Sequence, residues 1–257
     1  MRSAPPLTVS GWLRYDLVHR HLERRRGWSS VLEVGAGMGA VGVRLAASAA
    51  YTGVEPDEAS RAVATARVGS SGIVLADMAE VPAGRRFDVV CALEVLEHIE
   101  DDRDALQQWA DRLAPGGELV ISVPADPDRY GAADQLVGHH RRYSPERLVS
   151  LLGTVGLDDV EVMRYGFPLA FVLETVRNRV AARRLRNAAA PGPDRPAEED
   201  RPSAMVERTA GSGRWFQPAD ALAPVTRIAT APFRALQWSV SDRGPWLLAF
   251  ARRCGEA

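Results

Sequence analysis

Two patterns of hydrophobic residues alternate along this chain. Short runs that are apolar throughout are typical of buried strands, and stretches in which apolar residues return every three or four positions are typical of helices. We expect strands at residues 31–34, 51–54, 73–76, 87–92, 118–123 and 160–163. We expect helices at residues 39–49, 58–67 and 104–113, and from the Ser-Pro-Glu start at 144–146 to about residue 156.

The alternation of fully apolar strands with helices predicts the fold class. Strands that are buried on both faces form parallel sheets, because the helices that connect them cover both sides. We therefore expect an α/β, doubly wound, Rossmann-like sheet that is mostly parallel. In such folds the ligand binds beyond the carboxyl ends of the strands.

The two ends of the chain add elements to this sheet. Residues 1–28 contain an amphipathic helix with leucines at helical spacing, and residues 29–165 are expected to form the core. Residues 166–257 are expected to form a helical extension, in which 215–253 regains helical character. The segment 188–213 is rich in Pro, Ala, Gly and charge, which predicts a mobile loop inside that extension.

The composition and net charge of the chain limit the kinds of partner and compartment that we expect. The net charge of −1 gives the whole molecule no attraction to nucleic acid or to anionic membranes, so we do not expect nucleic acid as a partner. All 32 basic residues are arginine, which indicates a GC-rich, bacterial genome. Two cysteines make no disulfide framework, and no apolar run is long enough to span a membrane. We expect a cytoplasmic protein that at most contacts the inner face of the membrane.

One glycine-rich segment, VLEVGAGMGAVG, lies where the first strand turns into a helix. Glycines at such a turn let the backbone approach a ligand, and the helix start offers free N–H donors. Gly37, Gly39 and Gly42 match the dinucleotide-binding spacing G-x-G-x-x-G. Gly35, Gly37 and Gly39 form a second set, preceded by Glu33. A carboxylate beside the turn repels a pyrophosphate and attracts a cation, so Glu33 favours the second set.

This second set resembles the E/D-x-G-x-G-x-G signature of class I S-adenosylmethionine (SAM)-dependent methyltransferases. Further along, FDVV, EVLEHI and LAPGG, which begin at Phe87, Glu94 and Leu113, are similar to the family's block FDvv, EVLEHi and LkPGG in order and spacing. The resemblance covers about residues 29–157. It implies that SAM binds across the strand ends.

The resemblance also implies which residues contact the cofactor. An acid that ends the second strand accepts hydrogen bonds from two ribose hydroxyls, and Glu55, next to Pro56, has this position. Asp77 resembles the family position that contacts the adenine amino group, and Met78 is expected to pack on the ring. The full set of expected cofactor contacts is Glu33, Gly35, Ala36, Gly37, Glu55, Pro56, Asp77, Met78, Leu93 and Glu94.

Three histidines are candidates for the general base of such a reaction. Methyl transfer requires the attacking atom to lie in line with the sulfonium, and a hydroxyl must also lose its proton. Imidazole has a pKa suited to this task. We expect the base to be His98, His139 or His140, which lie near the strand ends. For His98 the alternative is a structural contact at the start of a loop.

The segment Glu94-x-x-Glu97-His98 has a second interpretation. It resembles the metal-binding E-x-x-E-H of small-RNA 2′-O-methyltransferases and of ubiquinone-pathway O-methyltransferases, and the RNA enzymes take a further histidine from a later loop. His139 and His140 lie in such a loop here. A divalent ion held by Glu94, Glu97 and His98 would acidify an acceptor hydroxyl. EVLEH also occurs widely in methyltransferases with no known metal dependence, and we favour this metal-free alternative.

The segment from Asp134 to Tyr143 resembles a D…GHxRRY loop of bacterial methyltransferases that act in glycan, lipid and secondary-metabolite pathways. Arg141 and Arg142 would bind a carboxylate or phosphate of the acceptor. Alternatively, they cap helices or pair with surface acids. Tyr143 either stacks on the acceptor or anchors the following helix. We expect this loop to form the acceptor wall.

These features predict a SAM-dependent methyltransferase that acts on a hydroxyl of a small-molecule, glycan or lipid-linked acceptor. Three alternatives stay open: an RNA 2′-O-methyltransferase, an NAD(P)-dependent oxidoreductase, and a SAM-binding scaffold without activity. N- and C-methylation are also compatible with the sequence. The apolar stripes and arginines of residues 165–186 and 215–253 are typical either of a lid or membrane-surface element, or of a packed extension or homodimer contact.

Overall fold

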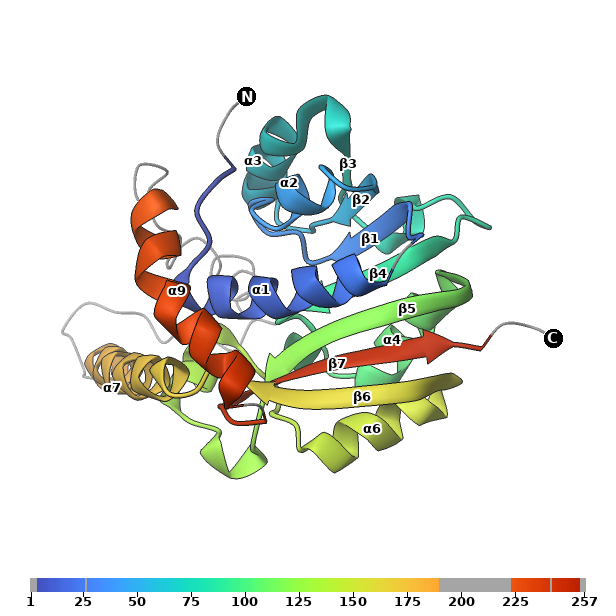
Figure 1. Ribbon diagram of the computed structural model, residues 1–257. Helices are drawn as coiled ribbons and strands as arrows, with labels where there is room; N and C mark the ends of the chain where they lie inside the picture. Colours follow the sequence, from blue (N-terminus) through green and yellow to red (C-terminus); the bar gives the residue numbers. More distant parts are fainter. Residues whose placement is uncertain (1–3, 26, 190–222, 241, 255–257) are drawn as a thin grey trace.

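A computed structural model of the protein describes residues 4–25, 27–189, 223–240 and 242–254. Its centre is a seven-stranded sheet with helices on both faces (Figure 1), and the strand order is β3-β2-β1-β4-β5-β7-β6. The strands are β1 Ser30–Val34, β2 Ala50–Val54, β3 Gly72–Leu75, β4 Phe87–Leu93, β5 Leu113–Pro124, β6 Leu157–Tyr165 and β7 Trp246–Arg253. Strands β1 to β5 are parallel, which confirms the predicted doubly wound, Rossmann-like fold.

The helices follow the predicted order except for a short helix at residues 132–137, which was not predicted, and one predicted helix differs greatly in length. They are α1 Val9–Arg24, α2 Gly42–Leu45, α3 Glu58–Val68, α4 Asp102–Asp111, α5 Ala132–Val137, α6 Pro145–Thr154, α7 Leu169–Ala189 and α9 Ala223–Ser239. The prediction of a helix over 39–49 is wrong at its start, because Gly39 has a φ of +75° and belongs to the preceding turn. A left-handed residue cannot continue a right-handed helix, so α2 begins only at Gly42.

Strand β7 corrects the expected helical character of residues 215–253. This prediction is right for α9 and wrong for β7, which lies antiparallel between β5 and β6 (Figure 1). Residues 246–251 are apolar and all buried. A short run of this kind fits a buried strand and a buried helix equally well, and only its two neighbouring strands decide between them. The sheet therefore includes residues beyond the expected core of 29–165.

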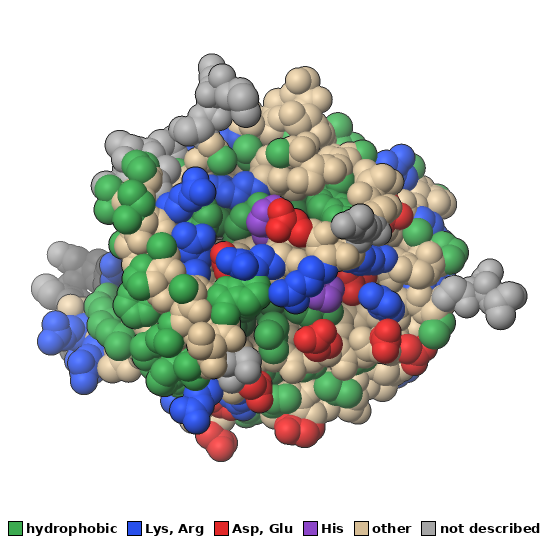
Figure 2. Space-filling model, in the orientation of Figure 1, with side chains coloured by type: hydrophobic (Ala, Val, Ile, Leu, Met, Phe, Trp, Pro, Cys, Tyr) green, Lys and Arg blue, Asp and Glu red, His purple; other side chains and the backbone are tan. Residues whose placement is uncertain are grey.

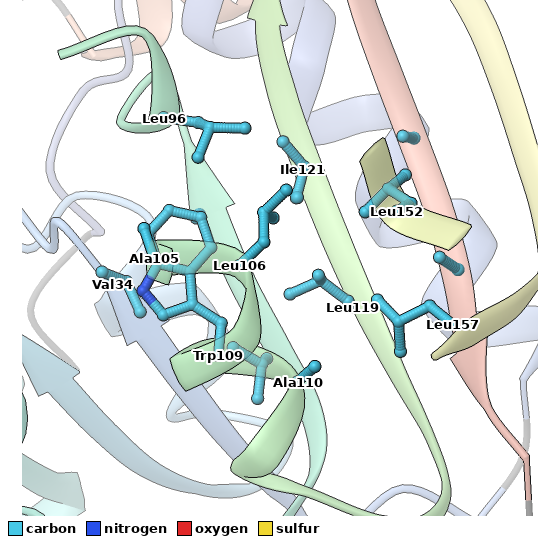
Figure 3. Close-up of a cluster of buried hydrophobic side chains, with 14 of the residues drawn as sticks. Val34, Leu96, Ala105, Leu106, Trp109, Ala110, Leu119, Ile121, Leu152 and Leu157 are labelled. Carbon is cyan, nitrogen blue, oxygen red and sulfur yellow. The ribbon is translucent and has the colours of Figure 1, made fainter. Parts of the chain in front are cut away.

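Two apolar layers cover the two faces of the sheet. On one face, Leu106 and Trp109 of α4 pack against Leu119 and Ile121 of β5, as Figure 3 shows, and Leu152 of α6 extends the same cluster. The other face is covered by α1, whose leucines at positions 13, 17 and 22 are buried with residues of β1, β4 and β7. The predicted amphipathic character of the first helix is confirmed.

The described part of the C-terminal extension consists of α7, α9 and β7. Residues 190–213 of the predicted mobile loop lie outside the described residues, whereas 188 and 189 belong to α7. Among the described helices, none combines the length and the apolar character needed to cross a membrane. The extension returns the chain to the sheet, and it places α9 beside α1 (Figure 1).

Candidate functional site

The glycine turn joins β1 to α2, and three of its glycines have a left-handed backbone. Gly35, Gly37 and Gly39 have φ angles of +74°, +53° and +75°, which side chains other than glycine rarely adopt. The N–H groups of Gly35 and Ala36 donate to the carbonyl oxygen of Val54 at 2.9 and 3.0 Å. The turn is thereby fastened to the end of β2, and its left-handed positions are those of the glycine set that follows Glu33.

Gly42 is needed for a different reason, which is space. Its φ is not in the left-handed region. A Cβ atom at Gly42 would lie 2.4 Å from the hydroxyl oxygen of Tyr51 and 3.0 Å from Oε2 of Glu33. The glycine lets the Tyr51 side chain pass beneath α2. The dinucleotide spacing noted in the sequence therefore has a packing explanation at its last position.

Glu33 is buried below this turn, with 3% of its surface exposed. It accepts a hydrogen bond of 2.6 Å from the hydroxyl of Tyr51. Burial raises the pKa of Glu33 to about 8, although the Tyr51 hydrogen bond and the charge of Arg14 act in the opposite direction. A neighbouring cation would favour the ionised form of this carboxyl group.

Glu55 links the end of β2 to the glycine turn. One carboxylate oxygen accepts from the N–H of Gly37 at 2.7 Å, and the other accepts from the N–H of Asp57 at 2.9 Å. A carboxylate has about four acceptor positions, so the buried Glu55 keeps acceptor capacity on both oxygens. Pro56, which follows, is exposed.

The expected adenine contacts lie at the end of β3. Asp77 is exposed, and its Oδ1 accepts a hydrogen bond from the N–H of Ala79 at 2.7 Å. Met78 is half-buried against the main apolar cluster. Because β1 to β4 are parallel, the expected cofactor residues all lie at or just after the carboxyl ends of strands on one edge of the sheet. The structure brings them to one edge, and their individual contacts with SAM stay predictions.

The chain leaves β4 through Glu94, which has a φ of +61°. This conformation is uncommon for a residue other than glycine. The hydroxyl of Ser122 donates to Oε1 of Glu94 at 2.5 Å, and Arg14 of α1 forms an ion pair with the same oxygen at 3.2 Å. Leu93, which ends β4, pairs with Ser122 in the sheet. Glu94 is therefore held by the neighbouring strand and by the N-terminal helix.

Three side chains with metal-binding or basic atoms meet just beyond this point. The ligand atoms of Glu97, His98 and His139 all lie within 4.8 Å of one another. The two imidazole rings meet edge to face with centroids 4.6 Å apart, and Nε2 of His139 lies 3.8 Å from Oε1 of Glu97. Two of the three histidines expected from the sequence are thus brought together.

This cluster contains buried polar atoms that lack partners. Both carboxylate oxygens of Glu97 and Nδ1 of His98 are buried and form no hydrogen bond with a described residue. Burial, with Glu94 nearby, raises the pKa of Glu97 well above its usual range. Burial, with the neighbouring His139, lowers the pKa of His98 to about 3. Buried polar groups are nearly always satisfied in native proteins, so the cluster has the character of a binding site.

Asp134 of α5 orients His139. Its Oδ1 lies 2.8 Å from Nδ1 of His139, and its carboxylate also accepts from Arg142. Burial alone would raise the pKa of Asp134, but these hydrogen bonds outweigh it and lower the pKa to about 2. An ionised carboxylate accepts only, so Nδ1 of His139 carries a proton, and the other ring nitrogen, Nε2, faces Glu97.

The family model of the methyltransferase domain matches residues 12–162, which is more than half of the chain. The chain belongs to this family. The assignment of the sequence to the class I SAM-dependent methyltransferases is therefore confirmed, and SAM is the cofactor of the group.

Several named methyltransferases are similar to this chain. A ubiquinone biosynthesis O-methyltransferase of Azotobacter vinelandii is 33% identical over 135 residues, which cover 49% of this chain and 56% of that enzyme. The dTDP-4-amino-2,3,4,6-tetradeoxy-D-glucose N,N-dimethyltransferase of Saccharopolyspora spinosa is 33% identical over 130 residues, which cover 48% of this chain and 51% of that enzyme. The methyltransferase thus matches little more than half the length of these relatives.

One solved structure adds to the comparison. The N-methyltransferase NodS from Bradyrhizobium japonicum, in complex with S-adenosyl-L-homocysteine, superposes with a TM-score of 0.50 and 26% identity. The superposition covers 59% of this methyltransferase and 77% of NodS. The relatives therefore include both O- and N-methyltransferases, and they support the fold and the cofactor without fixing the acceptor.

The structure corrects the predicted acceptor contacts of the methyltransferase. Arg142 is 5% exposed and binds Asp134 and Glu174, so its guanidinium is committed inside the protein. Tyr143 is fully buried and donates to Asp102 at 3.1 Å, which makes it the anchor of the following helix. Arg141 is partly exposed, but it pairs with Asp102 at 2.7 Å. The prediction of an acceptor wall is wrong for Arg142 and Tyr143, because burial and partners occupy both side chains.

Two further expectations change in detail. His140 contacts the cluster through its backbone, whose N–H donates to the carbonyl of Glu97 at 2.8 Å. Glu94, expected as a metal ligand, lies outside the cluster and pairs with Arg14, and His139 takes the third place. Arg14 itself was missed from the sequence. It follows the buried Leu13 on an ordinary amphipathic helix, and nothing in the local pattern marks its tip as reaching the strand ends.

The raised pKa of Glu33 gives a testable pH dependence of stability. The folded pKa of about 8 lies above the usual value of 4.5, so the folded state binds this proton more tightly. The stabilisation is complete below about pH 4.5 and is lost as the pH rises to about 8. Relative to Glu33→Gln, the free energy of unfolding of the wild type should fall by up to about 1.4 kcal/mol per pH unit in that window.

Urea unfolding at pH 5, 6.5 and 8 checks this prediction. Glu100→Gln is the matched control, because Glu100 is exposed and should follow the wild type at every pH. Parallel pH profiles for the wild type and Glu33→Gln would contradict the burial-driven shift of the Glu33 pKa.

Proposed function

We propose that this methyltransferase transfers the methyl group of SAM to a hydroxyl of a small-molecule, glycan or lipid-linked acceptor. The observation that carries the proposal is the Asp134–His139 pair, which directs Nε2 of the imidazole towards Glu97, just beyond the end of β4. A hydroxyl must lose its proton as it attacks, and a base oriented in this way accepts that proton.

The cofactor half of the proposal rests on complementary charge. The sulfonium and the α-amino group of SAM are cations, and Glu33 and Glu94 lie at the two strand ends beside the glycine turn. Arg14 lies near both, since it pairs with Glu94 and its charge acts on Glu33. We assign Arg14 to the carboxylate of the methionyl group, and Glu55 to the ribose hydroxyls.

The proposed acceptor step then needs only positioning and one proton transfer. With SAM bound, the acceptor hydroxyl would give its proton to Nε2 of His139 as its oxygen takes the methyl group. The C–S bond of SAM would break in the same step and leave S-adenosylhomocysteine. Asp134 stabilises the imidazolium that results. His98 is less suited to this role, because burial lowers its pKa to about 3 and a base so weak accepts a proton poorly at neutral pH.

A second candidate role for the same cluster is to hold a divalent cation. The observation that favours it is the pair of buried Glu97 oxygens without a hydrogen-bond partner among the described residues. One carboxylate and two imidazoles form a suitable donor set, and Asp134 behind His139 resembles the outer carboxylates that orient metal-binding histidines. Glu97, His98 and His139 would hold the ion, which would supply a Lewis acid for the acceptor oxygen.

The acceptor chemistry is tested with SAM that carries a trideuterated methyl group. The full chain is incubated with phenolic and sugar hydroxyl acceptors, with amino sugars and with a small RNA, and the products are analysed by mass spectrometry. We expect calorimetry to show binding of SAM and none of NAD, and the label to appear on oxygen. Label on amino nitrogen or on RNA alone would replace the proposed acceptor class. SAM binding with no transfer to any acceptor would favour a scaffold.

A further inference from the structure

A pocket lies on the outer side of α1, where α2 and α9 approach it. Its volume is about 270 Å³. The residues that α1 contributes, at positions 12, 15, 16 and 19, have the spacing of a single helix face, and Arg14 is not part of that stripe. The other walls are Arg44 of α2 and Arg227 and Arg234 of α9. Figure 2 shows basic side chains gathered where α9 passes the N-terminal half of α1.

The charge of this pocket is unbalanced. Three guanidinium groups line it, and the carboxylate that lines it, Asp16, is shared among several donors. Asp16 pairs with Arg234 and with Arg20, each at 3.5 Å, and accepts from Nε1 of Trp238 at 3.1 Å. One shared carboxylate cannot neutralise three arginines, so the pocket has a net positive charge.

Two of the arginines have no acidic partner among the described residues. Arg44 donates to the backbone carbonyls of Ala40 and Pro5, the latter at 2.8 Å, and Arg227 forms no ion pair with a described residue. Burial lowers the pKa of Arg44; Tyr15 acts in the opposite direction, and the charge of Arg227 adds to the lowering. The two guanidiniums therefore repel each other across the pocket, and an anion between them would relieve this repulsion.

Two of the pocket arginines, Arg44 and Arg234, are held in place before any ligand arrives. The Arg44 guanidinium lies over the ring of Trp12, 4.9 Å from its centroid, and that of Arg234 lies 5.3 Å from the same ring. The buried Nε of Arg234 donates no hydrogen bond to a described residue. Rigid arginines with unused donors lose little freedom on binding, which is the usual basis of selective anion recognition.

We propose that this pocket binds a phosphoryl group, as a phosphate monoester or a diphosphate. Two uncompensated guanidiniums from different helices, with Arg234 beside them, match an anion with two negative charges and several oxygens better than a single carboxylate. The same chemistry is presented by soluble phosphate compounds and by phosphorylated lipid headgroups. The bound anion would connect α9 to α1 and α2, on the side of α1 away from Arg14.

The test is a titration of the full chain with inorganic pyrophosphate, without SAM, at low ionic strength. We expect saturable binding with a 1:1 stoichiometry that weakens as salt is added. Arg227→Gln should weaken it about tenfold. Arg103→Gln, which removes the same charge from an exposed position on α4, should leave it unchanged. Arg227 is exposed, so the substitution leaves the core intact, and Arg44→Lys tests whether charge alone suffices.

A second arm separates the two sources of the phosphoryl group. Phosphatidylcholine vesicles with and without phosphatidic acid are sedimented with the wild type and with Arg227→Gln. Binding of pyrophosphate alone supports a soluble phosphate compound, and Arg227-dependent binding to phosphatidic acid vesicles supports a lipid headgroup. Binding of neither probe would overturn the proposal. An equal effect of Arg227→Gln and Arg103→Gln would also overturn it, since it would show only the net charge.

Discussion

Replacing His139 by alanine is expected to lower kcat for the hydroxyl acceptor by about 10²- to 10³-fold, with little change in the Kd of SAM. The side chain is the one imidazole of the cluster whose orientation is fixed by an ionised carboxylate, at 2.8 Å from Asp134. Its removal abolishes the proton acceptor and leaves the glycine turn and Glu55 in place. Steady-state kinetics with calorimetry on the same preparations measure both quantities.

Two companion variants sharpen this prediction. Asp134→Asn keeps the size of the side chain and removes the charge that fixes the Nδ1 proton, so kcat should also fall. His140→Ala should change kcat less than about tenfold, because His140 meets the cluster through its backbone N–H. A larger loss in His140→Ala than in His139→Ala would contradict the assignment of the base.

Removal of metal separates the two roles of His139. If the cluster holds a divalent cation, a chelator should abolish activity and Mg²⁺, Mn²⁺ or Zn²⁺ should restore it. Full activity of chelator-treated enzyme would exclude the metal role and leave His139 as the base. Binding of SAM, measured in parallel, should be unaffected in either case, because Glu33 and Glu55 lie outside the cluster.

The second large effect concerns stability. Replacing Arg142 by methionine is expected to lower the free energy of unfolding by about 3–5 kcal/mol. Arg142 is 5% exposed and is the shared partner of Asp134 of α5 and Glu174 of α7. Its loss would leave Asp134 with only His139 and Glu174 with only Arg129 as ion-pair partners among the described residues. Removal of one member of a buried ion network costs far more than removal of a surface pair.

Urea unfolding of the wild type and the variant measures this loss. The adjacent Arg141→Met is the matched control. Arg141 is more exposed, and its partner Asp102 keeps Arg147 and Tyr143, so its loss should cost at most about 1 kcal/mol. Equal destabilisation by both substitutions would show that the Arg142 network is not special. Because Asp134 also orients His139, Arg142→Met should reduce kcat as well.

Most of the residues expected to contact the cofactor could be located from the sequence, because short sequence patterns fix their positions. Fully apolar runs mark the parallel strands, and the acids and glycines that follow them are placed by the strand ends. The choice between the glycine sets also had a local basis in Glu33. The structure adds the reason for the last glycine, since Gly42 makes room for Tyr51.

The residues around the proposed acceptor site could not be predicted in the same way, because their roles depend on contacts between residues that are distant in sequence. The sequence places Asp134 in a loop motif, and its contact with His139 forms only when the following residues fold back onto α5. Arg141 and Arg142 are both arginines, yet only Arg142 is buried, where it pairs with Glu174 of α7, 32 positions later in the sequence. Arg14 reaches Glu94 from 80 positions away. The residues next to Arg14 or Arg142 in the sequence do not indicate which distant residue each will pair with.

The place of β7 in the sheet has a consequence for how the chain folds. Strands β5 and β6 are joined only through β7, and the 80 residues from Gly166 to Pro245 separate β6 from it. During synthesis, β6 cannot pair with the sheet, and the edge of β5 stays unpaired, until β7 has left the ribosome. Pairings so distant in sequence form slowly. A deletion that removes residues 246–253 would therefore take out an interior strand, and we expect it to yield aggregates in place of a shortened enzyme.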